Sequence, residues 1–273
     1  MAVRSRRPAI GGAGLICGLL CTSAVLAAEA TPNFSGYWGT PIAPFERVPE
    51  GGPGPVQNIW PYRFVQQLQN FAPNLDNPIL RPWALMRVYE QTLAEHRGID
   101  AGTAQQTCQP YGVPAILQLN DLVQILQRPE QITILYSRGQ QVRMIYLNQE
   151  HPRDLKPSWY GHSVGHWEGD TLVVDTVKQN DKTWTDRYAT PHTDQIHVVE
   201  RYQLVDGGPN NTKRLRVRFT VTDPGAFTTP WQGMMHYRVG APPMTEQVCA
   251  ENNRALDPEI QHLVPRANYK YPF

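Results

Sequence analysis

The segment 159–176 is the part of the chain richest in groups that could do chemistry. It is predicted to form a β-hairpin, with Glu-Gly-Asp at 168–170 as the turn. Its first strand carries His162 and His166, which share one face because side chains on a strand repeat every two residues. Asp175 lies on the returning strand. Titratable groups in an otherwise apolar ribbon are costly unless they are paired or used, so this hairpin is a candidate site for proton transfer.

A second candidate is Glu200, on a strand predicted over 195–205. It shares a strand face with Tyr202 and three aliphatic residues, and this apolar face must point to the interior. A carboxyl group there has a raised pKa unless a cation meets it. Two interpretations are equally open: a general acid or base in a ligand cavity, or half of a structural ion pair. The partner in such a pair could be Arg201, His162 or His166.

The histidines give only weak support to a metal site. Four residues apart on a strand, the rings of His162 and His166 are separated by roughly 13 Å and cannot bind one ion directly. A weaker alternative is a three-ligand site in which His162 is joined by His192 and His197. Because no spacing demands that site, we expect no metal ion and no other cofactor.

Five aromatic side chains are candidates to line a ligand cavity: Trp167, Trp184, Tyr202, Phe219 and Trp231. Trp184 lies in a long loop, 178–194, and loops at a barrel mouth commonly control access to the cavity.

The surrounding sequence must form the frame that positions these groups. Hairpins are predicted over 132–147 and 195–221, and a last strand over 231–239. A first strand is expected in 33–38, and two or three short strands in 108–128. A meander of about eight or nine strands closes most readily into a barrel, which can hold one small ligand. A β-sandwich is the second choice.

One helix is predicted, over 78–98, with Pro82 in its first turn and Gly98 at its end. Loops rich in Pro and Gly precede it. The fold class is therefore mainly β: an antiparallel lipocalin-like barrel with one N-terminal helix and long loops, forming a single domain over 28–273.

The first 27 residues have the form of a signal peptide, with three arginines before an apolar stretch. Ordinary secretion fits better than twin-arginine export, and we expect a periplasmic or secreted protein without an integral membrane span. Cleavage removes three of the 25 basic residues and none of the 24 acidic ones, so 22 and 24 remain, a balance of −2. That balance argues against nucleic acid and anionic membranes as partners. The oligomeric state is left open.

Two of the four cysteines leave with the signal peptide. Cys108 and Cys249 remain, and in an oxidising compartment they predict one disulfide. The alternative is two buried thiols.

Several long motifs resemble those of a widespread, largely uncharacterised group of secreted bacterial proteins. They are the Gly-His-Ser-Val-Gly-x-Trp-Glu-Gly-Asp-Thr-Leu-Val-Val-Asp-Thr pattern at 161–176, and the segments 190–202, 223–231 and 249–253. The resemblance covers most of 108–253 and implies export but no particular activity. The chain departs from the group at His166, where Arg is expected, and at 148–150, where Asp-Gly-Arg is expected.

The sequence favours a cofactor-free acid–base enzyme, of the lyase, hydratase or isomerase type, acting on a small apolar or aromatic molecule inside the barrel. Glu200 or Asp175 would be the base and His162 the partner acid, with His192 as a further candidate. The first alternative is a periplasmic carrier of a small ligand without turnover. The second is a metal-dependent hydrolase or oxygenase.

Overall fold

The computed structural model describes residue 1 and residues 31–39, 45–54, 79–96, 108–119, 122–186, 189–207 and 212–248. The chain divides into two units, Met1–Ala30 and Thr31–Phe273, and the second unit contains all the regular structure described below. Apart from Met1, the predicted signal peptide lies outside the described residues, as does Cys249. No helix within the described ranges is long and apolar enough to cross a membrane.

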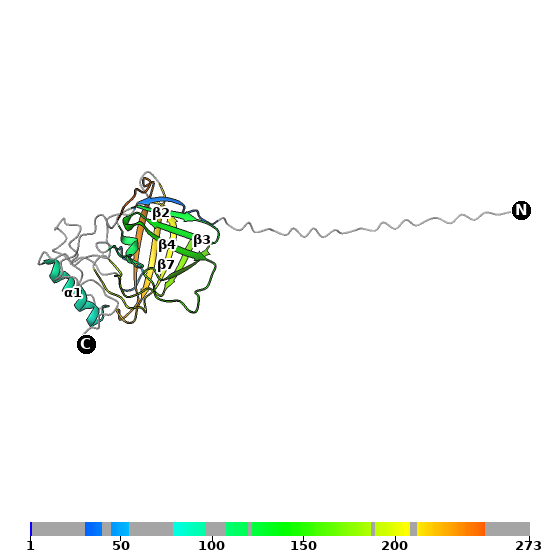
Figure 1. Ribbon diagram of the computed structural model, residues 1–273. Coiled ribbons are helices and arrows are strands. Elements are labelled where there is room, and N and C mark those ends of the chain that lie inside the picture. Colours follow the sequence, from blue (N-terminus) through cyan, green and yellow to red (C-terminus); the bar gives the residue numbers. More distant parts are fainter. Residues whose placement is uncertain are drawn as a thin grey trace. The chain divides into compact units, whose positions relative to one another are not determined.

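The described strands form a closed barrel (Figure 1), which confirms the predicted fold class. In chain order they are β1 (Gly36–Gly39), β2 (Leu122–Gln127), β3 (Gln131–Tyr136), β4 (Gln141–Leu147), β5 (His162–Glu168), β6 (Thr171–Val177), β7 (His197–Val205), β8 (Arg214–Thr222) and β9 (Trp231–Val239). Each strand pairs with the next along the chain, and β9 closes the barrel against β1 through Trp38 and Val239.

One pair of neighbours breaks the predicted antiparallel pattern. Strands β4 and β5 run parallel, with Ile145 opposite Ser163 and Leu147 opposite Gly165. The segment 148–161 therefore crosses from the end of β4 to the start of β5 instead of turning back on itself. A parallel connection needs about a dozen residues or more, and this one has that length. Asn148 begins it with a left-handed φ of 55°, which Asn tolerates better than most residues.

Alternating side chains fill the barrel interior as predicted for β8, where Leu215, Val217, Phe219 and Val221 are all buried. Opposite Phe219 on β9 lies Gly233, and a Cβ there would come within 2.4 Å of the phenyl ring. A glycine is required at this point because the ring occupies the space that any side chain would need.

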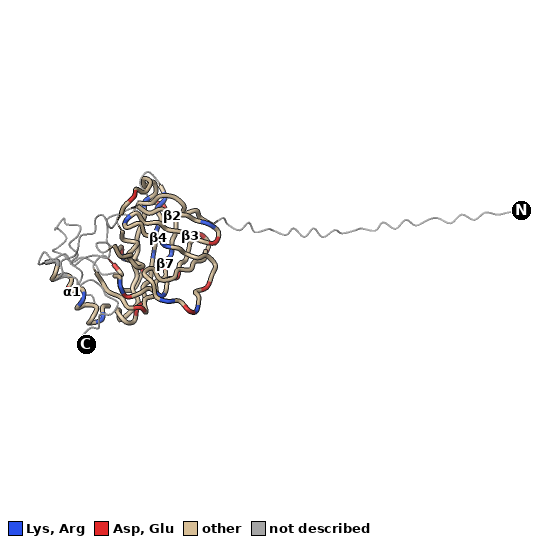
Figure 2. The backbone as a smooth tube through the Cα atoms, in the orientation of Figure 1, with Lys and Arg blue, Asp and Glu red and all other residues tan. Residues whose placement is uncertain are grey.

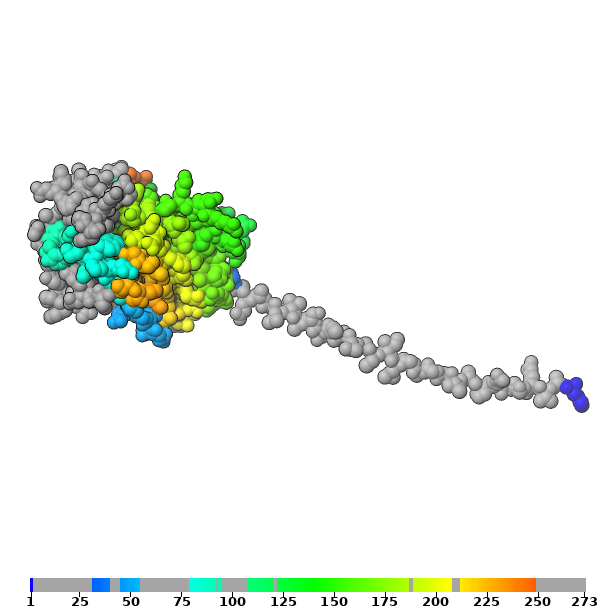
Figure 3. All heavy atoms as spheres, turned by 90° about the horizontal axis from the view of Figure 1, so that it is seen from below, coloured from blue at the N-terminus to red at the C-terminus, as the bar shows by residue number. Residues whose placement is uncertain are grey.

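The single α-helix among the described residues, α1 (Pro82–His96), begins at Pro82 and lies within the predicted 78–98. It is tied to the 223–228 turn: the Arg81 backbone N–H donates to the Ala226 carbonyl at 2.9 Å, and the Trp83 indole N–H donates to the Gly225 carbonyl at 2.8 Å. Figure 3 shows the cyan atoms of α1 against the orange atoms of this part of the chain. The helix thus packs on the end of the barrel, as a structural element would.

The prediction for 108–128 was wrong in its strand count. Of the described residues there, only β2 is a strand, and Ala115–Gln118 form a short 3-10 helix, η3, whose four residues are buried. Short apolar runs do not distinguish a strand from a buried helical turn.

Charged residues of both signs are interspersed along the barrel in the view of Figure 2. This distribution fits the small net charge of the sequence.

Candidate functional site

Glu200 points into the barrel interior, as its strand face predicted, and its side chain is fully buried. There it meets a cation that the sequence had not indicated, Arg143 of β4. Arg143 Nη1 donates to Glu200 Oε1 at 2.9 Å, and Nη2 donates to Oε2 in a second, shorter bond. The two groups form a bidentate pair, the strongest arrangement open to guanidinium and carboxylate.

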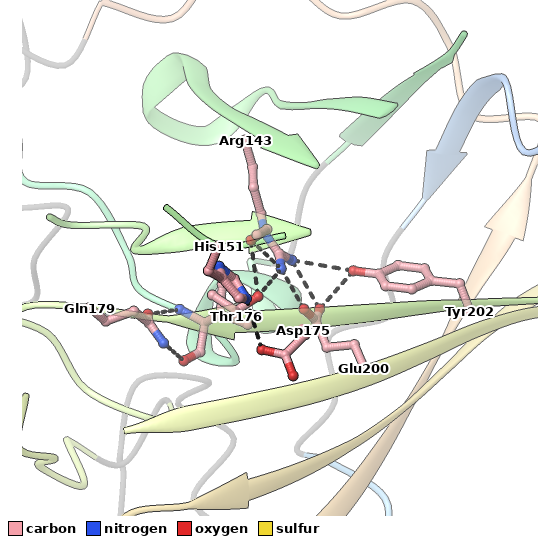
Figure 4. Close-up of polar contacts among 9 residues, drawn as sticks. Arg143, His151, Asp175, Thr176, Gln179, Glu200 and Tyr202 are labelled. Atoms are coloured by element: carbon pink, nitrogen blue, oxygen red, sulfur yellow. Dashed lines mark hydrogen bonds and ion pairs between the residues drawn. The ribbon is translucent and has the colours of Figure 1, made fainter. Parts of the chain in front are cut away.

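Polar side chains from neighbouring strands complete this network (Figure 4). The Tyr202 hydroxyl donates to Glu200 Oε1 at 2.7 Å. On the other side, Arg143 Nη2 donates to the hydroxyls of Ser163 at 3.1 Å and Thr176 at 3.0 Å. Both carboxylate oxygens and the guanidinium are therefore hydrogen-bonded, as buried charges must be.

The electrostatics of this network favour a permanent ion pair. Burial alone would lower the pKa of Arg143, but the Glu200 carboxylate outweighs it and holds that pKa well above its usual value. Burial, and then the charge of Glu200, raise the pKa of the Tyr202 hydroxyl, which therefore stays protonated as a donor. Both oxygens of the Glu200 carboxylate accept hydrogen bonds from Arg143 or Tyr202, so the geometry favours the ion-pair interpretation of Glu200 over the catalytic one.

Ser163 stands at the centre of Gly161-His-Ser-Val-Gly165, the spacing of a nucleophile elbow. An elbow requires a sharp turn between a strand and a helix that exposes the serine. Here Ser163 lies inside β5, is buried, and its hydroxyl is within 2.9 Å of the Thr176 hydroxyl. The motif instead forms a strand that supplies one of the hydroxyls around Arg143.

A second cluster lies on the outer face of the barrel wall, and we call it the outer-wall relay: His197, Asp175, His151 and His162. His197 Nε2 lies 2.9 Å from Asp175 Oδ2, and His151 Nε2 lies 3.1 Å from Asp175 Oδ1. His151 Nδ1 in turn lies 2.9 Å from His162 Nδ1. The side chains of Asp175, His151 and His197 are 38%, 23% and 42% exposed, so the cluster is partly shielded yet open to solvent.

The hydrogen bonds of the relay fix where the protons lie when the imidazoles are neutral. The Asp175 carboxylate only accepts, so His151 must carry its proton on Nε2 and donate it. His151 Nδ1 is then a lone pair, which accepts from the Nδ1–H of His162. The remaining nitrogen, His162 Nε2, is left as a basic lone pair at the end of the chain, and no described residue bonds to it. This assignment follows from the network of acceptors and donors.

Local charges set the ionisation of the relay. Burial, followed by the neighbouring His151, lowers the pKa of His162, so its ring is neutral at pH 7. The hydrogen bond to Asp175 raises the pKa of His197. Burial alone would raise the pKa of Asp175, but the hydrogen bonds from His197 and His151 outweigh it and lower that pKa. The carboxylate is therefore charged over a wide pH range.

The predicted grouping of Glu200 with Asp175 and His162 does not form. Glu200 pairs in register with Val174, the residue before Asp175. Because successive side chains on a strand leave opposite faces, Asp175 points outward where Glu200 points inward. Figure 4 shows the Asp175 carboxylate beside His151 and directed away from the Arg143 network. Asp175 and His162 do lie in one cluster, connected through His151.

His192 is buried in the 178–194 loop and belongs to neither cluster. Its Nδ1 donates to the Thr193 carbonyl at 2.9 Å and its Nε2 lies 2.9 Å from the Thr183 hydroxyl. Burial lowers its pKa, so it is a neutral residue that braces the loop. With both ring nitrogens occupied, His192 does not join His162 and His197 as a metal ligand. Within the described ranges, no three His, Cys, Asp or Glu side chains are arranged to hold a metal ion.

The same loop is tied to the chain before η3. Gln179 accepts from the Val113 backbone N–H at 2.6 Å and donates to the Val113 carbonyl at 2.8 Å.

His166, the other histidine of the hairpin, is 56% exposed and pairs with Glu168 at 3.2 Å, outside the relay.

Of the five aromatic residues predicted to line a cavity, only Phe219 and Trp231 have a ring contact with each other. Trp167 contacts Phe34 with ring centroids 5.2 Å apart, and Phe219 and Trp231 meet edge to face at 5.7 Å. Tyr202 belongs to the Arg143 network, and Trp184 is buried in the loop. The Trp231 indole N–H is buried and has no acceptor among the described residues.

The chain matches no protein-family model, no curated protein and no solved structure. The resemblance to secreted bacterial proteins therefore stays a prediction.

Proposed function

We propose that the protein is a cofactor-free acid–base enzyme in which His162 Nε2 is the proton acceptor. The observation that carries this proposal is the continuous hydrogen-bonded chain Asp175–His151–His162, which ends in a basic nitrogen with no partner among the described residues. A carboxylate that orients an imidazole and stabilises its charged form is the arrangement used for general-base catalysis.

In the proposed mechanism, His162 Nε2 removes a proton from the substrate or from a water molecule. The resulting imidazolium keeps its Nδ1–H donated to His151 Nδ1, while His151 keeps its own Nε2–H donated to the Asp175 carboxylate. The Asp175 carboxylate, acting through His151, orients the His162 ring and stabilises the positive charge that forms on it. His197 holds the second oxygen of Asp175 and fixes the orientation of the carboxylate.

Hydrolysis of p-nitrophenyl acetate tests the proposal without knowledge of the natural substrate. His162 Nε2 would take a proton from water as the water oxygen bonds to the acyl carbon. The bond from the acyl carbon to nitrophenolate then breaks, giving acetate and nitrophenolate with the protons in solution. A general base contributes about 10²–10⁴-fold, so His162→Gln should lower kcat/KM by at least about a hundredfold.

His166→Gln is the matched control, because His166 lies on the same face of β5 and also pairs with a carboxylate. Its rate should stay within about twofold of the unmodified protein. Equal rates for both variants and the unmodified protein would reject His162 as the base.

One observation favours the carrier alternative, in which the barrel interior holds a small ligand. Trp231 is 1% exposed, and within the described ranges its indole N–H has no acceptor; a ligand oxygen could supply one. A shift of the Trp231 indole N–H resonance on addition of cyclohexanone would support this alternative. An unchanged resonance at saturating ketone would reject it.

We also propose that residues 1–27 direct export to the periplasm or the medium, and that Cys108 and Cys249 form a disulfide there. The support is the composition of the first 27 residues and the loss of the other two cysteines with them. Counting thiols on the unreduced, denatured mature protein tests the pairing: none are expected, and two would contradict it.

A further inference from the structure

Three arginines occupy successive outward positions on β8: Arg214, Arg216 and Arg218. They alternate with Leu215 and Val217, which are buried, so the arginine side chains leave the outer face of the barrel. We call the three arginines the Arg216 row. Alternate residues on a strand are roughly 6.8 Å apart, so the row extends over roughly 14 Å.

The neighbouring strands add further positive charge beside the row. Arg201 of β7 lies directly opposite Arg218, and Arg238 of β9 lies directly opposite Arg214. Like charges that face each other across two strands destabilise a sheet. Burial, and then the charge of Arg218, lower the pKa of Arg216, which reflects the same repulsion. The sequence thus breaks a rule of strand pairing twice on one face, as expected where a surface serves function instead of stability.

The carboxylates nearby do not neutralise the row. Each has a different partner: Glu168 bonds to Arg201, Asp170 to Gln203 and Glu46 to His236. Within the described ranges, no Asp or Glu forms an ion pair with any member of the row. The Nε–H groups of its first and last members are buried and have no acceptor in the same part of the chain. The row therefore presents cations whose capacity to bind an anion is unused.

We propose that the Arg216 row is a docking surface for an extended acidic peptide segment with Asp or Glu at every second position. Alternate side chains of such a segment are also roughly 6.8 Å apart, so three carboxylates meet three guanidinium groups in register. Arginine suits this role because its planar group binds a carboxylate through two parallel hydrogen bonds. A bound segment would also relieve the repulsion between the facing arginines.

The position of β8 in the barrel decides how the segment lies. Because β7 and β9 pair with β8 on either side, a peptide cannot join the sheet there as a further strand. It must run along β8 over the outer face and bind through side chains. A broad anionic membrane is a poorer fit, because the formal net charge of the chain is only +1 and gives little long-range attraction.

Two synthetic peptides of equal composition and charge test the spacing. One alternates Glu and Thr over eight residues, and the other has four Glu followed by four Thr. The second peptide presents only two carboxylates on each face of an extended chain, so it forms one ion pair fewer with the row. Fluorescence anisotropy at low salt should show that the alternating peptide binds about threefold more tightly or better, since one exposed pair contributes up to about fivefold. Equal affinities would overturn the proposal.

Arginine variants test the surface itself. The double variant Arg214→Gln, Arg218→Gln should weaken binding of the alternating peptide by about tenfold, because two of the three ion pairs are lost. Its melting temperature should stay the same or rise, since the variant removes both like-charge pairs. The matched control is Arg128→Gln with Arg153→Gln, which removes two charges from exposed positions outside β7, β8 and β9 and should leave the affinity within about twofold.

Two results for the double variant would contradict the proposal. A lower melting temperature together with unchanged peptide affinity would show that the row is structural. Binding to phosphatidylglycerol vesicles that the double variant loses, while neither peptide binds the unmodified protein, would replace the peptide with a membrane surface. None of these measurements depends on ester hydrolysis, so the outcome is independent of the role proposed for His162.

Discussion

Arg143 and Glu200 are 57 residues apart in the chain and form a bidentate ion pair whose two side chains are 1% and 0% exposed. The pair joins β4 to β7 across the interior, and the hydroxyls of Tyr202, Ser163 and Thr176 surround it. A charge so enclosed is stable only while its partner is present. The interior network is therefore a structural element, and the proposed base belongs to the outer-wall relay instead.

The first prediction concerns the stability that this pair confers. Glu200→Gln keeps the side-chain shape but leaves the Arg143 cation without its counter-charge. The free energy of unfolding should fall by about 3–5 kcal/mol, measured by denaturant titration. Glu168→Gln is the matched control, because the Glu168–Arg201 pair is about half exposed and solvent already screens it. If both variants lose equally little stability, Glu200 is not held as described and its catalytic role is open again.

The second prediction concerns the order in which the relay histidines titrate. The pKa of His162 should lie below 6.5 because of burial and then His151, and that of His197 above 6.5 because of its bond to Asp175. Proton NMR of the carbon-bound imidazole protons measures both pKa values. Ester hydrolysis should accordingly fall as the pH is lowered through the His162 value. The opposite order of the two values would contradict the relay.

The same shifts define a pH window for stability. The raised pKa of His197 contributes stability below 6.5 that is lost as the pH rises through its folded value. The lowered pKa of Asp175 contributes stability above 3.8 that is lost as the pH falls through its folded value. Between pH 3.8 and pH 6.5, Asp175→Asn should lower the free energy of unfolding most. This deficit in stability should become smaller at alkaline pH. A deficit independent of pH would show that the carboxylate charge is not involved.

The third prediction concerns the packing of Gly233 against Phe219. An added methyl group at Gly233 would meet the phenyl ring at 2.4 Å, and Phe45 and Trp231 hold that ring in place. Gly233→Ala should therefore destabilise by about 1–3 kcal/mol, measured by thermal or denaturant unfolding. Gly52, where an added Cβ has nothing within 4 Å, provides the control substitution to Ala. A Gly233 variant as stable as that control would mean that the ring can move aside.

Local signals in the sequence were enough to predict the hairpins and the inward face of β7 and β8. They could not reveal Arg143 as the partner of Glu200. In Gln141–Leu147 both strand faces carry apolar residues, so alternation alone leaves open whether Arg143 or Met144 points inward. The inward orientation of Arg143 depends on the Glu200 carboxylate of β7, which lies 57 residues later in the chain.

His151 was missed for a different reason. It lies in the 148–161 connection, which has no periodicity that would orient a side chain. Its position depends on the parallel pairing of β4 with β5, and turn-rich sequence does not distinguish a crossover from a hairpin loop. The association of Asp175 with His162 could be anticipated from their shared outer face, but the residue that connects them could not.

The most direct test of the central claim is the tautomer of His162, measured from the ¹⁵N shifts of its ring at a pH where it is neutral. The relay predicts that the proton is on Nδ1, donated to His151, and that Nε2 is the bare, basic nitrogen. The same measurement on Asp175→Asn should show this preference weakened, because the acceptor that orients His151 loses its charge. A neutral His162 with its proton on Nε2 in the unmodified protein would contradict the relay, since no lone pair would then face the substrate.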